Sequence, residues 1–389
     1  MSQRVAIVAV AQTKYEENKS TLWQGDVAYE SVEEVLRQTG LTYSDRVSDG
    51  FGIDRILTTG EDHFVGRTCA SYWIHHYLGG YKMSHDNVSA DGIFAVYHAV
   101  IDILSGHYDT VLVSSMTKES ETARPAIENC YFDHIFLQPL GFDYLTASAL
   151  QAQRYMNKYG VSAEQCAQAT VQSRGNAGNN PYAQAPLDVT VEDVLKSEML
   201  ASPIRSLNSK PPVSDGACAL ILCTEEKAKK ITDNPVWVKG IGNCYDAHYL
   251  GDRDLADCDS LVIAAKKAYD MAGIDNPRDQ IDIAEISGEY SHQELMWSEG
   301  LGFCERGEGG KFIENGMSKM SGELPINPSG GVLSGNPIQV AGAARVVEAV
   351  TQLRHEAGAR QVENAETALA HGFTGACGQS HCVLILSNK

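Results

Sequence analysis

The chain has 389 residues, of which 43% are hydrophobic and 21% are charged. These proportions are typical of folded globular proteins and exclude a collagenous, coiled-coil or largely disordered chain. The net charge of -19 repels phosphate backbones and anionic lipid surfaces, so nucleic acids and membranes are poor partners. A CoA or nucleotide anion is not excluded, because a local patch of backbone N–H groups can bind it.

The ten cysteines contain no CxxC pair and no pattern of a small disulfide scaffold, which is typical of free thiols in the cytoplasm. The apolar run VAIVAVA at 5–11 resembles a short signal segment but suits a buried strand better. No run approaches the roughly 20 apolar residues of a membrane span. His63, His75 and His76 lack the spacing of zinc ligands. We therefore expect a cytoplasmic protein with no metal in this chain.

The first half of the chain begins with a predicted strand at 4–13. An amphipathic helix follows, with apolar residues at Val27, Val32, Val35 and Leu36, and Gly40 is expected to end it. The acidic, β-rich segment FGIDRIL comes next, and a glycine-containing turn from Ser89 then opens a long apolar helix. The run DGACALILCTEE closes this half as a buried strand.

The same order of elements recurs in the second half. A strand at 236–244 precedes a helix that Gly273 ends, then the segment IDIAEIS, then a glycine turn from Asn327 that opens an apolar helix. The run GQSHCVLILSNK closes the chain. This repetition predicts two α/β halves with mainly parallel sheets.

The first half is about 67 residues longer than the second, because the matching strands are 231 residues apart at the start and 164 at the end. The extra residues fall at about 118–200 and include an aromatic loop from Tyr131 to Tyr144. A long insertion in a symmetric core is typical of a loop domain that covers a substrate. The predicted units are 1–117 and 201–233 of the N-terminal domain, the loop domain 118–200, and the C-terminal domain 234–389.

Several stretches together resemble the thiolase superfamily along essentially the whole chain, and more narrowly its sterol-carrier/lipid-transfer branch. They read RYMNKYGVSAEQCAQATVQSRGNAGNNPYAQ, PPVSDGACALIL, HQELMWSEGLGFCERGEGG and NPSGGVLSGNP. A closer resemblance is to the thiolase-like subunits that work with a small zinc-ribbon/OB-fold partner, as in the benzoylsuccinyl-CoA thiolases of anaerobic toluene breakdown.

The resemblance implies a duplicated five-layer αβαβα fold with an inserted loop domain. It also implies an acyltransferase that uses coenzyme A as a substrate, a homodimer joined through edge strands, and a heterotetramer when the partner subunit is bound. The expected reaction is CoA-dependent C–C cleavage of a bulky β-oxoacyl-CoA, with an aromatic, benzoylsuccinyl-like acyl group as one option.

The thiolase nucleophile is a Cys at the start of the buried helix of the first half, in a Cys-x-Ser-Gly pattern. Here the pattern reads Ser89-Ala90-Asp91-Gly92, so Ser89 replaces the Cys. A hydroxyl without an adjacent base is a much weaker nucleophile than a thiolate. Ser89 therefore has either a chemical role or the role of a small helix-capping residue, and Asp91 is a second cap candidate. His85 is a weaker candidate near the same turn.

Three further positions match the family's active site. Its Gly-His-Pro motif reads Gly335-Asn336-Pro337, and Asn336 can donate a hydrogen bond to an oxyanion but cannot shuttle a proton. Where an amide is common in the family, Glu289 and Tyr290 supply a carboxylate and a phenol.

The C-terminal loop HGFTGACGQSHC holds the remaining titratable candidates. His371 could deprotonate the CoA thiol or a substrate carbon, since an ordinary imidazole titrates near neutral pH. Cys377 could instead be a relocated nucleophile. The alternative for both is a structural role in the core.

The glycines Gly330, Gly331 and Gly335 are interpreted as ligand-facing positions. Paired glycines allow positive φ and close approach of a ligand, and a helix from Pro337 would direct N–H groups at an anion. A tight turn without a ligand is the simpler explanation.

Two other functions fit the missing Cys. A retro-aldolase acting on a β-hydroxyacyl-CoA needs a base and an enolate-stabilising site but no thiol, and Tyr290, Glu289 or Tyr245 would serve. A non-catalytic subunit that binds acyl-CoA or scaffolds a partner is the third reading.

Overall fold

The structure is a computed structural model that describes residues 4–43, 51–66 and 68–389. Its centre is a nine-stranded sheet with the strand order β3-β2-β4-β7-β1-β8-β11-β10-β9. The first five strands in this order belong to the first half of the chain and the last four to the second half. Antiparallel pairing of β1 with β8, at Ile7–Val236 and Val5–Val238, joins the two half-sheets.

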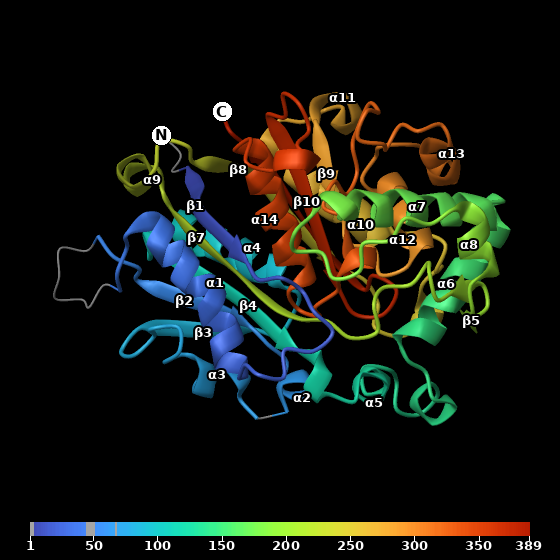
Figure 1. The fold of residues 1–389 in the computed structure, drawn as a ribbon, viewed down its shortest axis with the longest axis horizontal. Coiled ribbons are helices and arrows are strands. Elements are labelled where there is room, and N and C mark those ends of the chain that lie inside the picture. Colours follow the sequence, from blue (N-terminus) through green and yellow to red (C-terminus); the bar gives the residue numbers. More distant parts are fainter. Residues whose placement is uncertain (1–3, 44–50, 67) are drawn as a thin grey trace.

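The repeat predicted from the sequence is confirmed in its order of strand, helix, strand, central helix and two closing strands, although β3 of the first half has no counterpart in the second (Figure 1). The first half contains β1 (Val5–Gln12), α1 (Gln24–Thr39), β2 (Arg55–Thr59), α2 (Asp62–Val65), α3 (Ala70–Ile74), β3 (Ser84–Val88), α4 (Gly92–Leu104), β4 (Thr110–Lys118), β7 (Asp215–Thr224) and α9 (Glu225–Ile231). The second contains β8 (Val236–Tyr245), α10 (Asp259–Ala272), α11 (Pro277–Gln280), β9 (Ile283–Glu285), α12 (Ser291–Gly300), α13 (Gly309–Glu314), α14 (Ala341–Leu353), β10 (Thr367–Thr374) and β11 (Ser380–Ser387).

The helices and half-sheets form the layers α1, first half-sheet, α4 with α14, second half-sheet, α10. The central hydrophobic core contains Ile93 of α4, Val346 of α14 and strand residues of both halves. A second core lies between α1 and the outer face of the first half-sheet, and a third lies between α10, α12 and the second half-sheet. This order is the αβαβα arrangement expected from the resemblance.

The prediction of mainly parallel strands is wrong. Parallel pairing occurs between β2 and β3, β2 and β4, and β9 and β10, whereas the other pairings of the large sheet are antiparallel. The closing strands β7 and β11 run against both of their neighbours. Helices cover both faces of each half-sheet, so these antiparallel strands are as continuously apolar as parallel ones usually are.

Residues 119–214 connect β4 to β7 and form the segment that lengthens the first half. They contain α5 (Arg124–Asn129), α6 (Tyr144–Tyr159), α7 (Ala163–Asn176), α8 (Val191–Lys196), β5 (Met199–Ala201) and β6 (Ile204–Arg205). Tyr155, Cys166 and Ala169 of this segment pack into the core of the second half. The insertion therefore crosses from one half to the other. The predicted domain boundaries stay predictions.

Candidate active site

A narrow cavity lies where loops from both halves and the insertion meet. It follows the carboxyl ends of β2, β3, β9 and β10, the edge at which α/β proteins bind ligands. We call it the central cavity, with a free volume of about 40 Å³. It is lined by Glu61, Phe64, Asp91, Tyr131, Tyr144, Ser287, Glu289, Val332, Asn336, Ile338, Gln339, Ala341, Phe373, Thr374 and Gly375.

Asn336 and Glu289 meet on one wall of the central cavity. The Asn336 Nδ2 donates to Glu289 Oε1 at 3.2 Å, and the Asn336 backbone N–H donates to Ser214 Oγ at 3.1 Å. Both residues are at least nine-tenths buried. An amide nitrogen carries two N–H donors, so Asn336 keeps one donor for a ligand oxygen.

A buried network of charges lies behind that wall. Lys210 Nζ is 2.5 Å from Glu289 Oε1, and Arg124 Nη2 is 3.4 Å from the same oxygen. Arg124 also pairs with Glu119 and Glu128, both at 2.7 Å. The carboxylates raise the pKa of Arg124, although burial opposes them. The network fixes Glu289 through residues of the first half and the insertion, because buried ion pairs break only at a large cost.

Asp91 joins the first turns of the two central helices. Its Oδ1 accepts from the Ile93 N–H of α4 at 3.0 Å, and its Oδ2 accepts from the Gly342 N–H of α14 at 2.9 Å. Of the two cap candidates from the sequence, Asp91 is therefore the N-cap of α4 and Ser89 is not. Burial raises the pKa of Asp91 to about 6, although these backbone donors oppose the rise.

Ser89 is exposed and does not line the central cavity. Its Oγ donates to the Gly60 carbonyl at 3.4 Å. His85, another candidate near the same turn, lies on β3, where its Nε2 is 2.9 Å from Thr58 Oγ1. The turn between β3 and α4 thus brings Asp91, rather than Ser89, to the cavity.

His371 lies within β10 and not in the loop after it. Its side chain is fully buried against Trp297, Phe373 and His381, and its Nε2 is 2.9 Å from His381 Nδ1. Burial lowers the pKa of His371 to about 3. The prediction that the His371 imidazole titrates near neutral pH is therefore wrong, because β10 places this side chain away from solvent and from the cavity lining.

Cys377 lies in the turn between β10 and β11, beside the cavity residue Gly375. It packs with Phe132, Tyr144 and Ala147, and burial raises the pKa of its thiol to about 12. A thiol with a raised pKa has little thiolate near neutral pH, so this environment does not activate Cys377 as a nucleophile.

Tyr290 follows Glu289 but is not among the residues that line the cavity. It is the residue before α12, it is buried with Ala149, Ala152 and Ile204, and burial raises its pKa well above the ordinary value. Tyr245, at the end of β8, is 61% exposed and does not line the cavity either.

Gly330 and Gly331 have φ angles of 91° and 60°, which favour glycine. A Cβ at Gly330 would lie 2.5 Å from Ala177, and one at Gly331 would lie 2.6 Å from Asn327. Close packing of the loop thus explains both, and neither lines the cavity. Gly335 has an extended φ of 170°. The expected helix start at Pro337 is wrong, because α14 begins at Ala341.

Several cavity residues carry no sequence signal of function. Glu61 follows β2, and burial raises the pKa of its carboxyl to about 7 while the neighbouring Gln339 amide opposes the rise. Tyr131 OH and Ser287 Oγ have no hydrogen-bond partner among residues 4–43, 51–66 and 68–389. Polar atoms of this kind normally find a partner, so they are available to a ligand.

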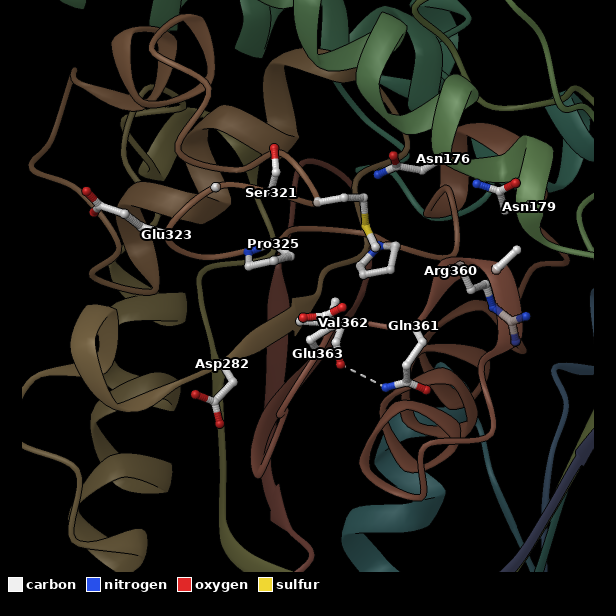
Figure 2. Close-up of a pocket in the computed structure, with 14 residues that line it drawn as sticks. Asn176, Asn179, Asp282, Ser321, Glu323, Pro325, Arg360, Gln361, Val362 and Glu363 are labelled. Atoms are coloured by element: carbon white, nitrogen blue, oxygen red, sulfur yellow. Dashed lines mark hydrogen bonds between the residues drawn. The ribbon is translucent and has the colours of Figure 1, made fainter.

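A larger cavity of about 660 Å³ lies at the far end of the second half (Figure 2). Its wall carries Asp282, Glu323 and Glu363, and its buried cation, Arg360, is already paired with Glu348 at 2.8 Å. None of the residues singled out from the sequence lines it. In the described part of the chain, no helix is long and apolar enough to cross a bilayer, and no group of acidic, His and Cys side chains is arranged for a metal ion.

Comparison with known proteins identifies the family of the chain. Residues 242–388 match the family described as "Thiolase C-terminal domain-like". The chain is 35% identical to an acetyl-CoA acetyltransferase of Methanothermobacter thermautotrophicus, over 96% of this chain and 97% of that protein. It is 36% identical to the benzoylsuccinyl-CoA thiolase subunit BbsB of Thauera aromatica, over 59% of this chain and 60% of that subunit.

A solved structure titled "Ltp2-ChsH2(DUF35) aldolase" has the same fold, with a TM-score of 0.82 and 24% identity over 99% of this chain and 97% of the solved chain. The acetyl-CoA acetyltransferase matches this chain over almost its whole length, and the fold is duplicated. Both findings agree with the resemblance found in the sequence. This chain belongs to the thiolase superfamily and is a thiolase-like, acyltransferase-type enzyme.

Proposed function

We propose that the enzyme cleaves a C–C bond in a β-hydroxyacyl-CoA by a retro-aldol reaction. The observation that supports this is the composition of the central cavity. Its lining has three carboxyl groups and several unused hydrogen-bond donors, but no Cys or His among the described residues. That set suits proton transfer and oxyanion stabilisation, and it lacks the thiolate on which an acyl-enzyme is built.

The reaction needs a base and an oxyanion site. The base removes the proton of the β-hydroxyl, the Cα–Cβ bond breaks, and the β-carbon leaves as an aldehyde or ketone. The bonding electrons pass to the thioester enolate, which is then protonated at Cα to give the shortened acyl-CoA. We assign to Asn336 the hydrogen bond to the enolate oxygen, because one N–H of its amide is not used by Glu289 and oxyanion sites use such donors.

The acyl group that best fits is bulky and aromatic. Phe64 and Tyr131 stack with ring centroids 6.3 Å apart, Tyr144 adjoins Tyr131 at 5.9 Å, and Phe373 lies on the same lining. Aromatic walls favour flat apolar groups. The cavity is small as it stands, so the insertion that carries Tyr131 and Tyr144 has to move outward when such a group enters.

A second candidate is CoA-dependent thiolysis of a β-oxoacyl-CoA, which the names of the acetyl-CoA acetyltransferase and BbsB relatives favour. With Ser89 exposed and the pKa of Cys377 raised, this reaction would proceed by direct attack of the CoA thiolate on the β-carbonyl. A benzoylsuccinyl-CoA-like substrate is the corresponding acyl donor.

Both proposed reactions include a partner subunit that binds this chain. BbsB is named as a subunit, and the aldolase neighbour is titled with a DUF35 partner, which supports a small zinc-ribbon/OB-fold protein as the partner of this chain. A homodimer is also proposed, because β3 pairs only with β2 among the described strands and so presents a free sheet edge.

The test uses the purified chain with and without its partner. The probe 3-hydroxy-3-phenylpropanoyl-CoA, incubated without free CoA, is expected to give benzaldehyde and acetyl-CoA by mass spectrometry. Benzoylsuccinyl-CoA with free CoA tests thiolysis in parallel. Cleavage that requires free CoA would replace the lyase proposal by the thiolase one, and no turnover in either assay with the partner present would favour a scaffold.

A further inference from the structure

We propose that Glu61 is the general base of this site, taking the proton from the substrate β-hydroxyl and returning it to Cα after the C–C bond has broken. The inference rests on the proposed retro-aldol reaction. Sequence patterns do not single out Glu61, and no comparison with a known protein assigns it a role.

The backbone holds Glu61 at a fixed place in the cavity wall. Its N–H donates to Gln339 Oε1 at 3.2 Å, and its carbonyl accepts from the Phe64 and Val65 N–H groups, both at 3.0 Å. The preceding Gly60 carbonyl accepts from Asn87 Nδ2 at 2.8 Å. Glu61 is therefore tied to β3 and to the loop before α14 of the other half, as a catalytic group must be.

The other two carboxyl groups of the cavity are already engaged. Asp91 uses both oxygens on the backbone N–H groups of α4 and α14, and Glu289 is paired with Lys210 and Arg124. By contrast, no Lys or Arg in the described residues forms an ion pair with Glu61. Its titratable neighbours are Tyr144 of α6, which it influences electrostatically, and Asp91 across the cavity.

The free energy of ionising Glu61 is set mainly by burial, because no cation among the described residues stabilises its charged form. Burial raises the pKa of Glu61 to about 7, and the Gln339 amide opposes the rise. A base with a pKa near the working pH combines a useful ionised fraction with basic strength. The pKa of Asp91 is raised by burial as well, but both oxygens of Asp91 are held by backbone N–H groups of α4 and α14.

The unused polar atoms around Glu61 match the oxygens of the substrate. Tyr131 OH and Ser287 Oγ lie in the lining of the same cavity without partners among the described residues, and the Gln339 amide hydrogen-bonds the Glu61 carboxyl. Ser287 and Gln339 are 3% and 4% exposed, and Gln339 has a φ of 66°, which is strained for a residue other than glycine. Buried unpaired polar groups are costly, and the thioester and hydroxyl oxygens would satisfy them.

One carboxyl can serve both proton transfers. The β-oxygen and Cα are both bonded to the β-carbon, so they lie within one bond angle of each other. Glu61 gains the hydroxyl proton as the Cα–Cβ bond breaks and gives it to the enolate carbon, so that the base ends the cycle ionised. No oxidant, reductant or further reactant is needed.

The test compares Glu61→Gln with the wild-type enzyme in the presence of its partner. We expect kcat for cleavage of 3-hydroxy-3-phenylpropanoyl-CoA to fall about 10²–10⁴-fold with KM changed less than about threefold. The wild-type kcat/KM should rise with pH through an apparent pKa near 7, and the variant should lose this limb. Glu61→Ala should regain activity with added formate, which replaces the missing carboxylate. Glu33→Gln, the same change at an exposed position of α1, is the matched control.

A second measurement separates this inference from the proposed function. Wild-type enzyme in D₂O should exchange the Cα protons of acetyl-CoA, and Glu61→Gln should not. Cleavage and exchange retained in the variant would overturn the role of Glu61 and leave the lyase standing. Exchange that depends on Glu61 without any CoA-independent cleavage would overturn the lyase alone. If the variant does not fold, the wild-type enzyme alone gives the test. Exchange whose rate does not depend on pH around 7 overturns the inference, and so does a wild-type enzyme that exchanges no protons.

Discussion

The Asn336 amide and the Lys210 ammonium donate to the same oxygen, Glu289 Oε1, at 3.2 Å and 2.5 Å. This shared acceptor determines which way the Asn336 amide faces. One N–H is used on Glu289 and the other is left for the cavity, while the cation behind Glu289 keeps that carboxylate in place. The Asn336 amide in this wall is thus an oriented hydrogen-bond donor and does not transfer protons.

Replacement of Asn336 by Ala should therefore impair chemistry more than binding. We expect kcat to fall about 10²–10³-fold, the usual effect of removing one oxyanion donor, with a small change in KM. Steady-state kinetics on 3-hydroxy-3-phenylpropanoyl-CoA measure this. Asn234→Ala changes an exposed asparagine and serves as the control. Equal losses in both variants would mean that Asn336 has no special role.

Replacement of Lys210 by Met should destabilise the protein through the buried network. Glu289 would keep the longer ion pair to Arg124 and the hydrogen bond from Asn336, and breaking a buried pair typically costs about 3–5 kcal/mol. Urea unfolding measures the loss, and adding Glu289→Gln should restore part of it. Lys229→Met, at an exposed pair with Glu225, should change little. An unchanged midpoint in Lys210→Met would contradict the network's structural role.

Replacement of Ser89 by Ala should leave turnover within about twofold of the wild type. Ser89 is exposed, its hydroxyl donates to the Gly60 carbonyl at 3.4 Å, and it is outside the cavity lining. An acyl-enzyme on Ser89 would instead require a loss of several orders of magnitude. Kinetics together with intact-protein mass spectrometry decide between the two, since a covalent intermediate adds the mass of the acyl group.

Local sequence signals predicted the repeated order of strands and helices well. Gly40 and Gly273 end α1 and α10 with φ angles of 65° and 72°, because a left-handed residue closes a helix at lowest cost when it lacks a side chain. Strand directions were not predictable in this way. A strand covered on both faces is apolar throughout whichever way its neighbours run, so β7 and β11 resemble parallel strands in the sequence.

The site was only partly predictable, because it is built from loops far apart in the chain. Asn336 and Glu289 were found through family motifs, and they do lie together. Glu61 is an ordinary acidic residue in its local sequence, and its burial depends on Gln339, 278 residues away. The position of His371 in a family motif suggested a site residue, but the motif gave no sign that β10 would place this side chain in the core.

The buried state of His371 has a consequence for the pH dependence of stability. The folded protein keeps this imidazole neutral down to about pH 3, whereas in the unfolded chain it takes up a proton near its usual pKa of about 6.5. Below about pH 6.5 the unfolded state therefore binds more protons, and stability falls as the pH falls toward 3. One such group contributes a slope of up to about 1.4 kcal/mol per pH unit.

Replacement of His371 by Gln should remove that contribution while preserving a donor for His381. Urea unfolding between pH 4.5 and 7.5 should show a slope smaller by about one proton in the variant, with His381, His292 and His85 accounting for part of what remains, because burial lowers their pKa values too. His107→Gln, the same change at an exposed imidazole, is the matched control variant. Turnover at pH 7.5 should stay within a few-fold of the wild type, because His371 does not reach the cavity; a loss of 10² or more would restore it as the catalytic base.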